Sequence, residues 1–172
     1  MLMEEWVKHF KEPKLISIDP GKVGGIAVYS LEKKEIIDLT AMPETPQDLL
    51  GFIKRYQNNS RCYLEKVGGI PGQGGAASMF NFGRGFGWIE MALLANKIPT
   101  IEVTPQKWQK ELQVGSKGKK STNEWKTKLV QIAQHRWPTV GKRFDLRFKK
   151  DWLAIGDALL ILEYARLIEI KK

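Results

Sequence analysis

Short apolar runs bounded by turn residues predict five β-strands. The predicted strands cover residues 14–19, 24–30, 35–40, 61–67 and 100–104. The first run alternates apolar and small polar side chains before its final aspartate, which is typical of a buried strand. The connections at Pro20–Gly21 and at 31–34 are too short for parallel crossovers. We therefore expect the first three strands to form an antiparallel meander.

Helical periodicity fills most of the chain between and after these strands. The predicted helices cover residues 46–57, 78–95, 121–137 and 151–170. Thr45 suits the N-cap of the first helix, and Ser121 with Glu124 forms a capping box at the third. Pro105 fits the first position of a further helix directly after the fifth strand. This order indicates an α/β fold, in which a mixed five-stranded sheet is flanked by helices.

The remaining segments carry weaker signals. Residues 1–12 form a short amphipathic pattern and are expected to be an N-terminal extension ending at Pro13. The segments 114–120 and 139–150 are basic and are predicted to be loops, the first of them mobile. A length of 172 residues suits a single domain, which we assign to 1–172.

Three glycines interrupt the second predicted helix. Gly83, Gly85 and Gly87 each cost about 1 kcal/mol relative to alanine inside a helix. Close approach of a neighbouring backbone would account for that cost. The neighbour is a packed helix, the second copy in a dimer, or a bound phosphate.

Composition narrows the class of protein. The net charge is +9, from 28 Lys and Arg against 19 Asp and Glu, which fits a polyanionic partner, most often nucleic acid. The single cysteine excludes a disulfide framework and a thiolate zinc cluster, and two histidines make a histidine-based metal site an unfavourable interpretation. No apolar run approaches the roughly 20 residues that span a bilayer, and the acidic N-terminus does not resemble a secretory signal. We expect a soluble, cytoplasmic protein without a membrane partner.

Three acids lie in unusually apolar surroundings. Asp19 ends the first strand, Glu65 lies within the fourth, and Asp157 precedes an apolar run on the last helix. Placed together, three carboxylates repel one another, and a divalent cation removes that penalty. Each acid also has a simpler interpretation: an Asx turn for Asp19, an exposed strand face for Glu65, and a surface acid paired with a neighbouring lysine for Asp157. Their joint occurrence with the positive charge favours the metal site.

Several motifs resemble those of the RuvC-like Holliday junction resolvases, of phage, bacterial or organellar type, within the ribonuclease-H-like superfamily. The matching segments are Ile-Asp-Pro-Gly (18–21) with Gly-Gly-Ile-Ala (24–27), Leu-Glu-Lys-Val (64–67), Pro-Gly-Gln-Gly (71–74) with residues 78–83, Val-Thr-Pro (103–105) with Trp108, residues 133–138, and Gly-Asp-Ala-Leu-Leu-Ile (156–161). They appear in one order over nearly the whole chain. The resemblance implies a ribonuclease-H-like fold with strands 1–3 antiparallel.

The resemblance also implies that Asp19, Glu65 and Asp157 are catalytic carboxylates that bind Mg²⁺ or Mn²⁺, with two ions in each active site. The family usually has a fourth acid three or four residues before the last, where this chain has Leu153 and Ala154. Asp151 is the nearest upstream acid, and the sequence leaves its role open between fourth ligand and helix cap. If Asp151 does not serve, a lysine takes part of the electrostatic role. The candidates are Lys107, Lys110, Lys117, Lys119 and Lys120.

Basic and aromatic residues supply candidate DNA contacts. The basic loop offers Lys117, Lys119 and Lys120 for phosphates, and a second basic cluster includes Arg136 and Arg143. The aromatic residues of the second predicted helix are either core residues or wedges that enter unstacked bases. The wedge candidates are Phe80 and Phe82, with Ile70 in the preceding glycine-rich segment.

The predicted function is a metal-dependent, structure-selective endonuclease that resolves Holliday junctions or other branched DNA. A four-way junction presents two equivalent strands, so paired cuts require two active sites and a C2 homodimer. We expect the glycine-interrupted helix, around 80–94, to form that interface. Two alternatives stay open: a non-catalytic module that binds branched DNA, suggested by the missing fourth acid, and a nuclease for flaps or RNA–DNA hybrids.

Overall fold

The structure is a computed structural model that describes residues 12–67 and 75–171. The predictions for the N-terminal extension up to residue 11, and for Ile70 and the glycine-rich segment 68–74, lie outside the described residues. No described helix is both long enough and apolar enough to cross a membrane.

The sheet has five strands in the order β3-β2-β1-β4-β5. The strands are β1 (Lys14–Asp19), β2 (Gly25–Ser30), β3 (Glu35–Ala41), β4 (Ser60–Glu65) and β5 (Thr100–Val103). β1 pairs antiparallel with β2, and β2 antiparallel with β3, which confirms the predicted meander. β4 pairs parallel with β1, and β5 parallel with β4, so the sheet is mixed.

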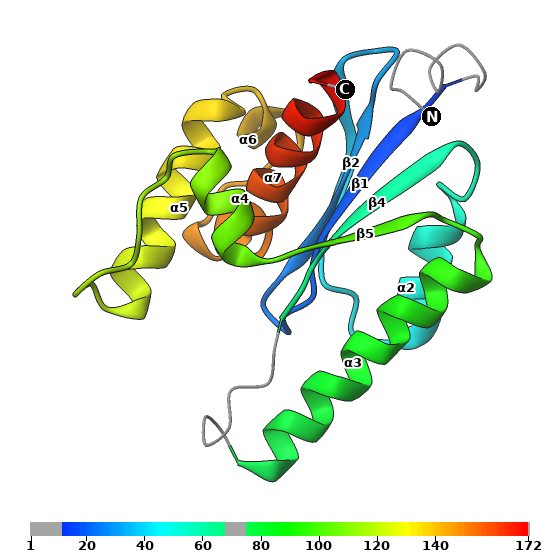
Figure 1. Cartoon of the computed structure of the whole chain (residues 1–172), viewed down its shortest axis with the longest axis horizontal. Helices are drawn as coiled ribbons and strands as arrows, with labels where there is room; N and C mark the ends of the chain where they lie inside the picture. The colour runs from blue at the N-terminus through cyan, green and yellow to red at the C-terminus, as the bar shows by residue number, and fades with distance from the viewer. Residues whose placement is uncertain (1–11, 68–74, 172) are drawn as a thin grey trace.

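Helices cover both faces of the sheet, as predicted (Figure 1). One face carries α2 (Pro46–Lys54) and α3 (Ala76–Ala95). The other carries α4 (Pro105–Glu111), α5 (Thr122–Arg136), α6 (Val140–Arg143) and α7 (Lys149–Ile170). The fold is therefore α/β, with a mixed five-stranded sheet between two helical layers.

Local capping explains where several helices begin. The Thr45 side chain accepts a hydrogen bond from the Asp48 N–H, and Ser121 and Glu124 make the predicted reciprocal capping box. The prediction of an uninterrupted loop over 139–150 is wrong, because α6 occupies part of it and α7 begins at Lys149. The short α6 turn buries Val140 against the core, and tertiary packing of this kind is not visible in local periodicity.

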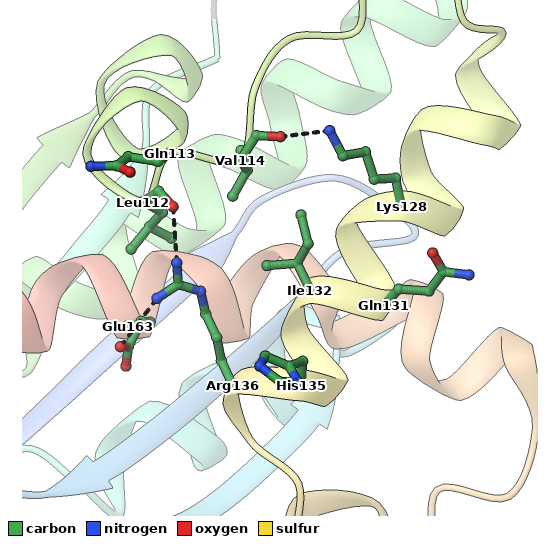
Figure 2. Close-up of a pocket in the computed structure, with 9 residues that line it drawn as sticks. All are labelled: Leu112, Gln113, Val114, Lys128, Gln131, Ile132, His135, Arg136 and Glu163. Atoms are coloured by element: carbon green, nitrogen blue, oxygen red, sulfur yellow. Dashed lines mark hydrogen bonds and ion pairs between the residues drawn. The ribbon is translucent and has the colours of Figure 1, made fainter.

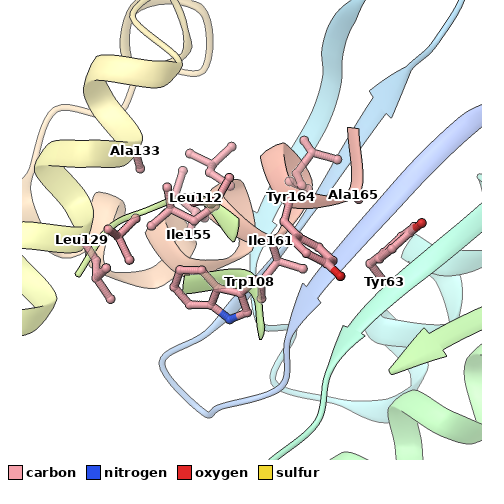
Figure 3. Packing of buried hydrophobic residues seen from close by; sticks show 14 of the residues in the cluster. Tyr63, Trp108, Leu112, Leu129, Ala133, Ile155, Ile161, Tyr164 and Ala165 are labelled. Atoms are coloured by element: carbon pink, nitrogen blue, oxygen red, sulfur yellow. The ribbon is translucent and has the colours of Figure 1, made fainter. Parts of the chain in front are cut away.

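Strand alternation divides the core into two clusters. On β4, Tyr63 faces the side of α7, whereas Cys62 and Leu64 face α2 and α3. Figure 3 shows the first cluster, where Trp108 and Tyr63 pack with side chains of α5 and α7. α7 is buried on all sides over residues 158–162, because it lies between the sheet and α5.

The far end of α7 is fastened to β4 by a buried ion pair. Glu169, which is 0% exposed, accepts hydrogen bonds from one Arg61 nitrogen at 2.9 and 2.8 Å and from the Tyr63 hydroxyl. Glu169 lies twelve residues after Asp157, near the other end of α7. Arg61 and Tyr63 share their face of β4 with Glu65. This contact therefore fixes α7 along the strand that carries Glu65.

Candidate active site

Two of the predicted carboxylates end neighbouring parallel strands. Ile18 of β1 pairs with Leu64 of β4, so Asp19 and Glu65 each follow by one residue at the same edge of the sheet. Parallel neighbours lie about 4.8 Å apart, and alternation turns both side chains toward α7. The topology alone therefore brings together two residues that are 46 positions apart in the chain.

Asp157 reaches the same edge through the packing of α7 on β1. The buried Ser17 hydroxyl, on the α7 side of β1, donates to the carbonyl of Ala158 at 2.7 Å. Two glycines permit close packing of α7, one where it meets β2 and one where it meets α5. A Cβ on Gly25 would lie 2.7 Å from the Ala154 carbonyl oxygen, and one on Gly156 would lie 3.1 Å from a Val130 methyl group. The helix therefore lies against the strand ends with Asp157 directed into the site.

The turn after β1 shapes the surroundings of Asp19. The Gly21 N–H donates to Asp19 Oδ1 at 3.2 Å, so the Asx turn weighed as the simpler interpretation is present. A Cβ on Gly24 would lie 2.2 Å from the Asp19 carbonyl oxygen and 2.8 Å from its carboxyl carbon. Gly24 is thus required for the turn to close on Asp19, and the Asx turn helps to orient the carboxylate.

The three carboxylates are buried and interact electrostatically. Asp19, Glu65 and Asp157 are 8%, 6% and 8% exposed. Burial, and then repulsion from Asp157, raises the pKa of Asp19, while Lys126 and the Gly21 N–H oppose the rise. Burial, and then repulsion from Asp19 and Asp157, raises the pKa of Glu65 to about 7. The exposed-face interpretation of Glu65 is wrong, because β4 lies inside the sheet.

Lys126 supplies positive charge to this site, and the sequence analysis did not nominate it. Its ammonium group donates to an Asp157 carboxylate oxygen, in an ion pair whose side chains are 36% and 10% exposed. Burial opposes the charge of Lys126, but the carboxylates of Asp157, Asp19 and Glu65 outweigh it and raise its pKa. The sequence does carry a signal for Lys126. It lies four residues before Val130 and seven before Ala133, so it shares a helix face with two buried residues.

Asp151 lies at the start of α7 and serves as a helix cap. Its carboxylate accepts a hydrogen bond from the Phe148 N–H at 3.0 Å. It is not among the charges that shift the pKa of Asp19 or Glu65. Of the two roles that the sequence left open, the described geometry provides the cap.

The three carboxylates are of the ligand type that a hard divalent cation prefers. Three buried carboxylates offer oxygen ligands whose mutual repulsion a cation would relieve. In the described part of the chain, no group of three His, Cys, Asp or Glu side chains is arranged so that it could hold one metal ion. The compensating positive charge comes from Lys126 instead. Asp19, Glu65 and Asp157 would hold the ion, and Lys126 would have to yield part of its contact with Asp157.

The candidate DNA-binding residues have different environments. Lys117, Lys119 and Lys120 are exposed in the loop that directly precedes α5, the helix of Lys126. Arg143 pairs with Glu35 at 2.8 Å on the surface. Phe80 is 68% exposed.

Phe82 and Arg136 are less accessible. Phe82 is half-buried and stacks on Phe86 with ring centroids 6.4 Å apart. Arg136 is engaged inside the protein, because it donates to the Leu112 carbonyl at 2.9 Å and pairs with Glu163 at 3.6 Å.

A groove beside α5 does not belong to the carboxylate site. Figure 2 shows Lys128 and Arg136 reaching across it to the carbonyls of Val114 and Leu112, at 2.8 and 2.9 Å. These contacts tie the segment after α4 to α5. The lining residues include none of the three carboxylates, and both cations are occupied by internal contacts. The two cations that reach across the groove therefore stabilise the packing of α5, and the groove is not a candidate binding site.

Comparison with known proteins supports the fold. No family model matches the chain, and no curated protein sequence matches it. Among solved structures, RuvC of Thermus thermophilus in complex with a Holliday junction substrate matches with a TM-score of 0.58 and 14% identity, over 90% of this chain and 96% of that chain. Another Thermus thermophilus RuvC structure matches with a TM-score of 0.49 and 15% identity, over 91% and 97%. The fold is ribonuclease-H-like. Within that class, its architecture is similar to that of RuvC.

Proposed function

We propose that this chain is a single nuclease domain that hydrolyses phosphodiesters in branched DNA, Holliday junctions in particular, with Mg²⁺ or Mn²⁺. The observation that carries the proposal is the convergence of Asp19, Glu65 and Asp157, which are buried together at one edge of the sheet. The RuvC-like fold and the net charge of +9 support a DNA substrate. The location of such an enzyme would be cytoplasmic.

The side chains of the site would have different roles. Asp19, Glu65 and Asp157 would bind the ions, which supply Lewis acidity and an activated water when bound. Lys126 holds Asp157 and keeps positive charge beside the carboxylates. It therefore takes the electrostatic role that the sequence analysis assigned to a lysine when the fourth acid is absent. Asp151 keeps its cap. Because the chain has Ala154 where a fourth carboxylate is expected, a second ion would bind weakly, and Lys126 would supply part of the positive charge.

The DNA would approach along the edge where β1 and β4 end. The loop containing Lys117, Lys119 and Lys120 precedes α5, and Lys126 lies in the second turn of that helix. The loop is therefore close in the chain to the cation that pairs with Asp157. Exposed lysines bind phosphates without reading sequence. The exposed ring of Phe80, on α3, is the better placed of the two proposed wedges.

A homodimer would form through α3. Met91 and Leu94 are 60% and 70% exposed, and with Gly83 and Gly87 they fall within a sector of about 80° on the helix. A Cβ on either glycine would meet no described atom within 4 Å, so packing inside the described chain does not explain them. An apolar helix face with glycines four residues apart suits close packing against a second copy of itself.

The mass of the protein in solution tests the dimer. Met91→Glu places a charge within this face and should convert a dimer to a monomer in light-scattering measurements. Leu50→Glu is the matched control, because Leu50 is 43% exposed on α2, outside the α3 face. A monomeric wild-type protein would contradict paired junction cutting.

A cleavage assay on a synthetic four-way junction tests the activity. With Mg²⁺ we expect paired symmetric nicks, and none in EDTA. Asp19→Asn should abolish cutting while junction binding persists. Asp145→Asn is the control, because that exposed aspartate pairs only with Arg147 among the described contacts. Asp151→Asn should still cut, and its inactivity in a folded protein would restore Asp151 as the fourth ligand.

The same assay separates the alternatives. Junction binding without Mg²⁺-dependent cutting by the wild type would favour the non-catalytic module. Faster cutting of a flap or an RNA–DNA hybrid than of the junction would favour a nuclease with another substrate. Substrates of equal length and label make these rates directly comparable.

A further inference from the structure

The carboxylate of Glu65 is held by a tryptophan. Trp108 Nε1 donates to Glu65 Oε1 at 2.8 Å, and the two residues are 1% and 6% exposed. In the sequence, Trp108 is notable only as part of the motif that includes Val-Thr-Pro (103–105). Figure 3 shows its indole packed among Leu112, Leu129 and Ile155. This packing fixes the direction of the N–H group.

The topology places Trp108 at the end of β4. Val103, the last residue of β5, pairs with Glu65, and the Lys66 N–H donates to its carbonyl at 2.8 Å. α4 then begins at once, because Thr104 caps it and Pro105 takes its first position. Trp108 is therefore in the first turn of a helix that starts beside Glu65. A rigid strand-to-helix connection sets the position of the donor.

The three carboxylates have different partners, and the difference is chemical. Asp157 is bound by the ammonium of Lys126, and Asp19 by the Gly21 N–H. Glu65 is bound by the neutral N–H of a side chain distant in the sequence, which fixes one oxygen without cancelling the negative charge. A carboxylate accepts about four hydrogen bonds or ligands. Oε2 and the second lone pair of Oε1 thus stay available to a cation.

We propose that Trp108 is a positioning residue for the metal site: its indole N–H fixes the Glu65 carboxylate in the orientation that accepts the divalent ion. This inference rests on the proposed function. Trp108 would not touch the DNA or the ion, and it acts through Glu65. Partners that orient a metal ligand in this way typically change metal affinity tenfold to a hundredfold when they are removed.

Magnesium titration of the full-length protein tests the role without using cleavage. Trp108→Phe removes the donor and keeps an aromatic ring. Trp137→Phe is the matched control, because Trp137 also donates its indole N–H, but to the Leu159 carbonyl, at 3.2 Å. Calorimetry should show Mg²⁺ binding weakened tenfold to a hundredfold in Trp108→Phe, and changed less than threefold in Trp137→Phe.

Nitrogen–proton NMR of the indole groups supplies an independent readout. The chain has six tryptophans, and the signal lost in Trp108→Phe assigns that residue. In the wild type this signal should move with Mg²⁺ along the calorimetric binding curve, while the Trp137 signal stays in place. Equal affinity losses in both variants, unchanged affinity in Trp108→Phe, or a Trp108 signal that ignores Mg²⁺ overturns the positioning role alone. A wild type that binds no Mg²⁺ overturns the metal site and the positioning role together.

Discussion

Replacing Glu65 with glutamine should stabilise the metal-free protein. The pKa of Glu65 is raised from 4.5 to about 7, first by burial and then by repulsion from Asp19 and Asp157. At about 1.4 kcal/mol per pH unit, ionising this side chain costs the folded state about 3 kcal/mol at pH 8. Glutamine carries no charge, and its amide oxygen can still accept the Trp108 hydrogen bond. For a chain of this length, about 3 kcal/mol corresponds to an increase in Tm of about 6–12 °C.

The stability difference between Glu65→Gln and the wild type should grow as the pH rises. Below pH 4.5, Glu65 is protonated in both the folded and the unfolded protein, so glutamine should bring no advantage. Between 4.5 and about 7, the unfolded chain releases the proton while the folded chain keeps it, so wild-type stability falls as the pH rises. Above pH 7 the folded side chain also ionises, and the difference between wild type and variant should reach its plateau.

Thermal denaturation followed by circular dichroism in EDTA, from pH 4.5 to 8, measures this difference. Glu32→Gln is the matched control, since it removes an exposed charge and should change the unfolding free energy by less than about 0.5 kcal/mol. Saturating Mg²⁺ should reduce or reverse the order, because a ligand at 100 times its Kd adds about 2.7 kcal/mol to the protein that binds it better. The reasoning fails if Glu65→Gln is no more stable than wild type at pH 8, or if its advantage does not vary with pH.

Three further substitutions have defined outcomes. Gly24→Ala places a Cβ 2.2 Å from the Asp19 carbonyl oxygen. Urea denaturation should show a free energy of unfolding lower by about 1–3 kcal/mol, and junction cleavage should be abolished. Gly51→Ala, with open space in α2, should be neutral or stabilising, and equal losses in both variants would contradict the steric argument. Glu169→Gln removes the buried carboxylate that pairs with Arg61 of β4 and should cost about 3–5 kcal/mol. A change under about 1 kcal/mol in the same assay would refute this expectation. Lys126→Met should lower the free energy of unfolding by about 1–2 kcal/mol without metal, because the lysine is only partly exposed. The variant should also bind Mg²⁺ more tightly in calorimetry, because a competing cation is gone. Weaker Mg²⁺ binding would count against this expectation.

Local signals predicted the elements and the three carboxylates. The five strands, the long helices and the caps at Thr45 and Ser121 are confirmed. Alternation and helical period are properties of a few neighbouring residues, so they are readable without the fold. The three acids were identifiable for the same reason, because each interrupts an apolar run.

The partners of those acids were not readable in the same way. Lys126 and Trp108 are 31 and 43 residues from the carboxylates that they contact. The helical spacing of Lys126 places it on a buried face, and Trp108 belongs to a motif, but neither local signal says which carboxylate the residue contacts. Asp151 shows the converse, since an acid near the expected position becomes a cap once the start of α7 is set at Lys149.

The sequence by itself determined which segments are strands and helices and which acids lie in apolar surroundings, because those properties depend on neighbours within a few positions. Only the tertiary structure decided which charge faces which. The parallel pairing of β1 with β4 joins Asp19 to Glu65, and the packing of α5 and α7 on that sheet delivers Lys126 to Asp157. Contacts of this kind depend on how whole elements pack, and the spacing of residues along the chain does not encode them.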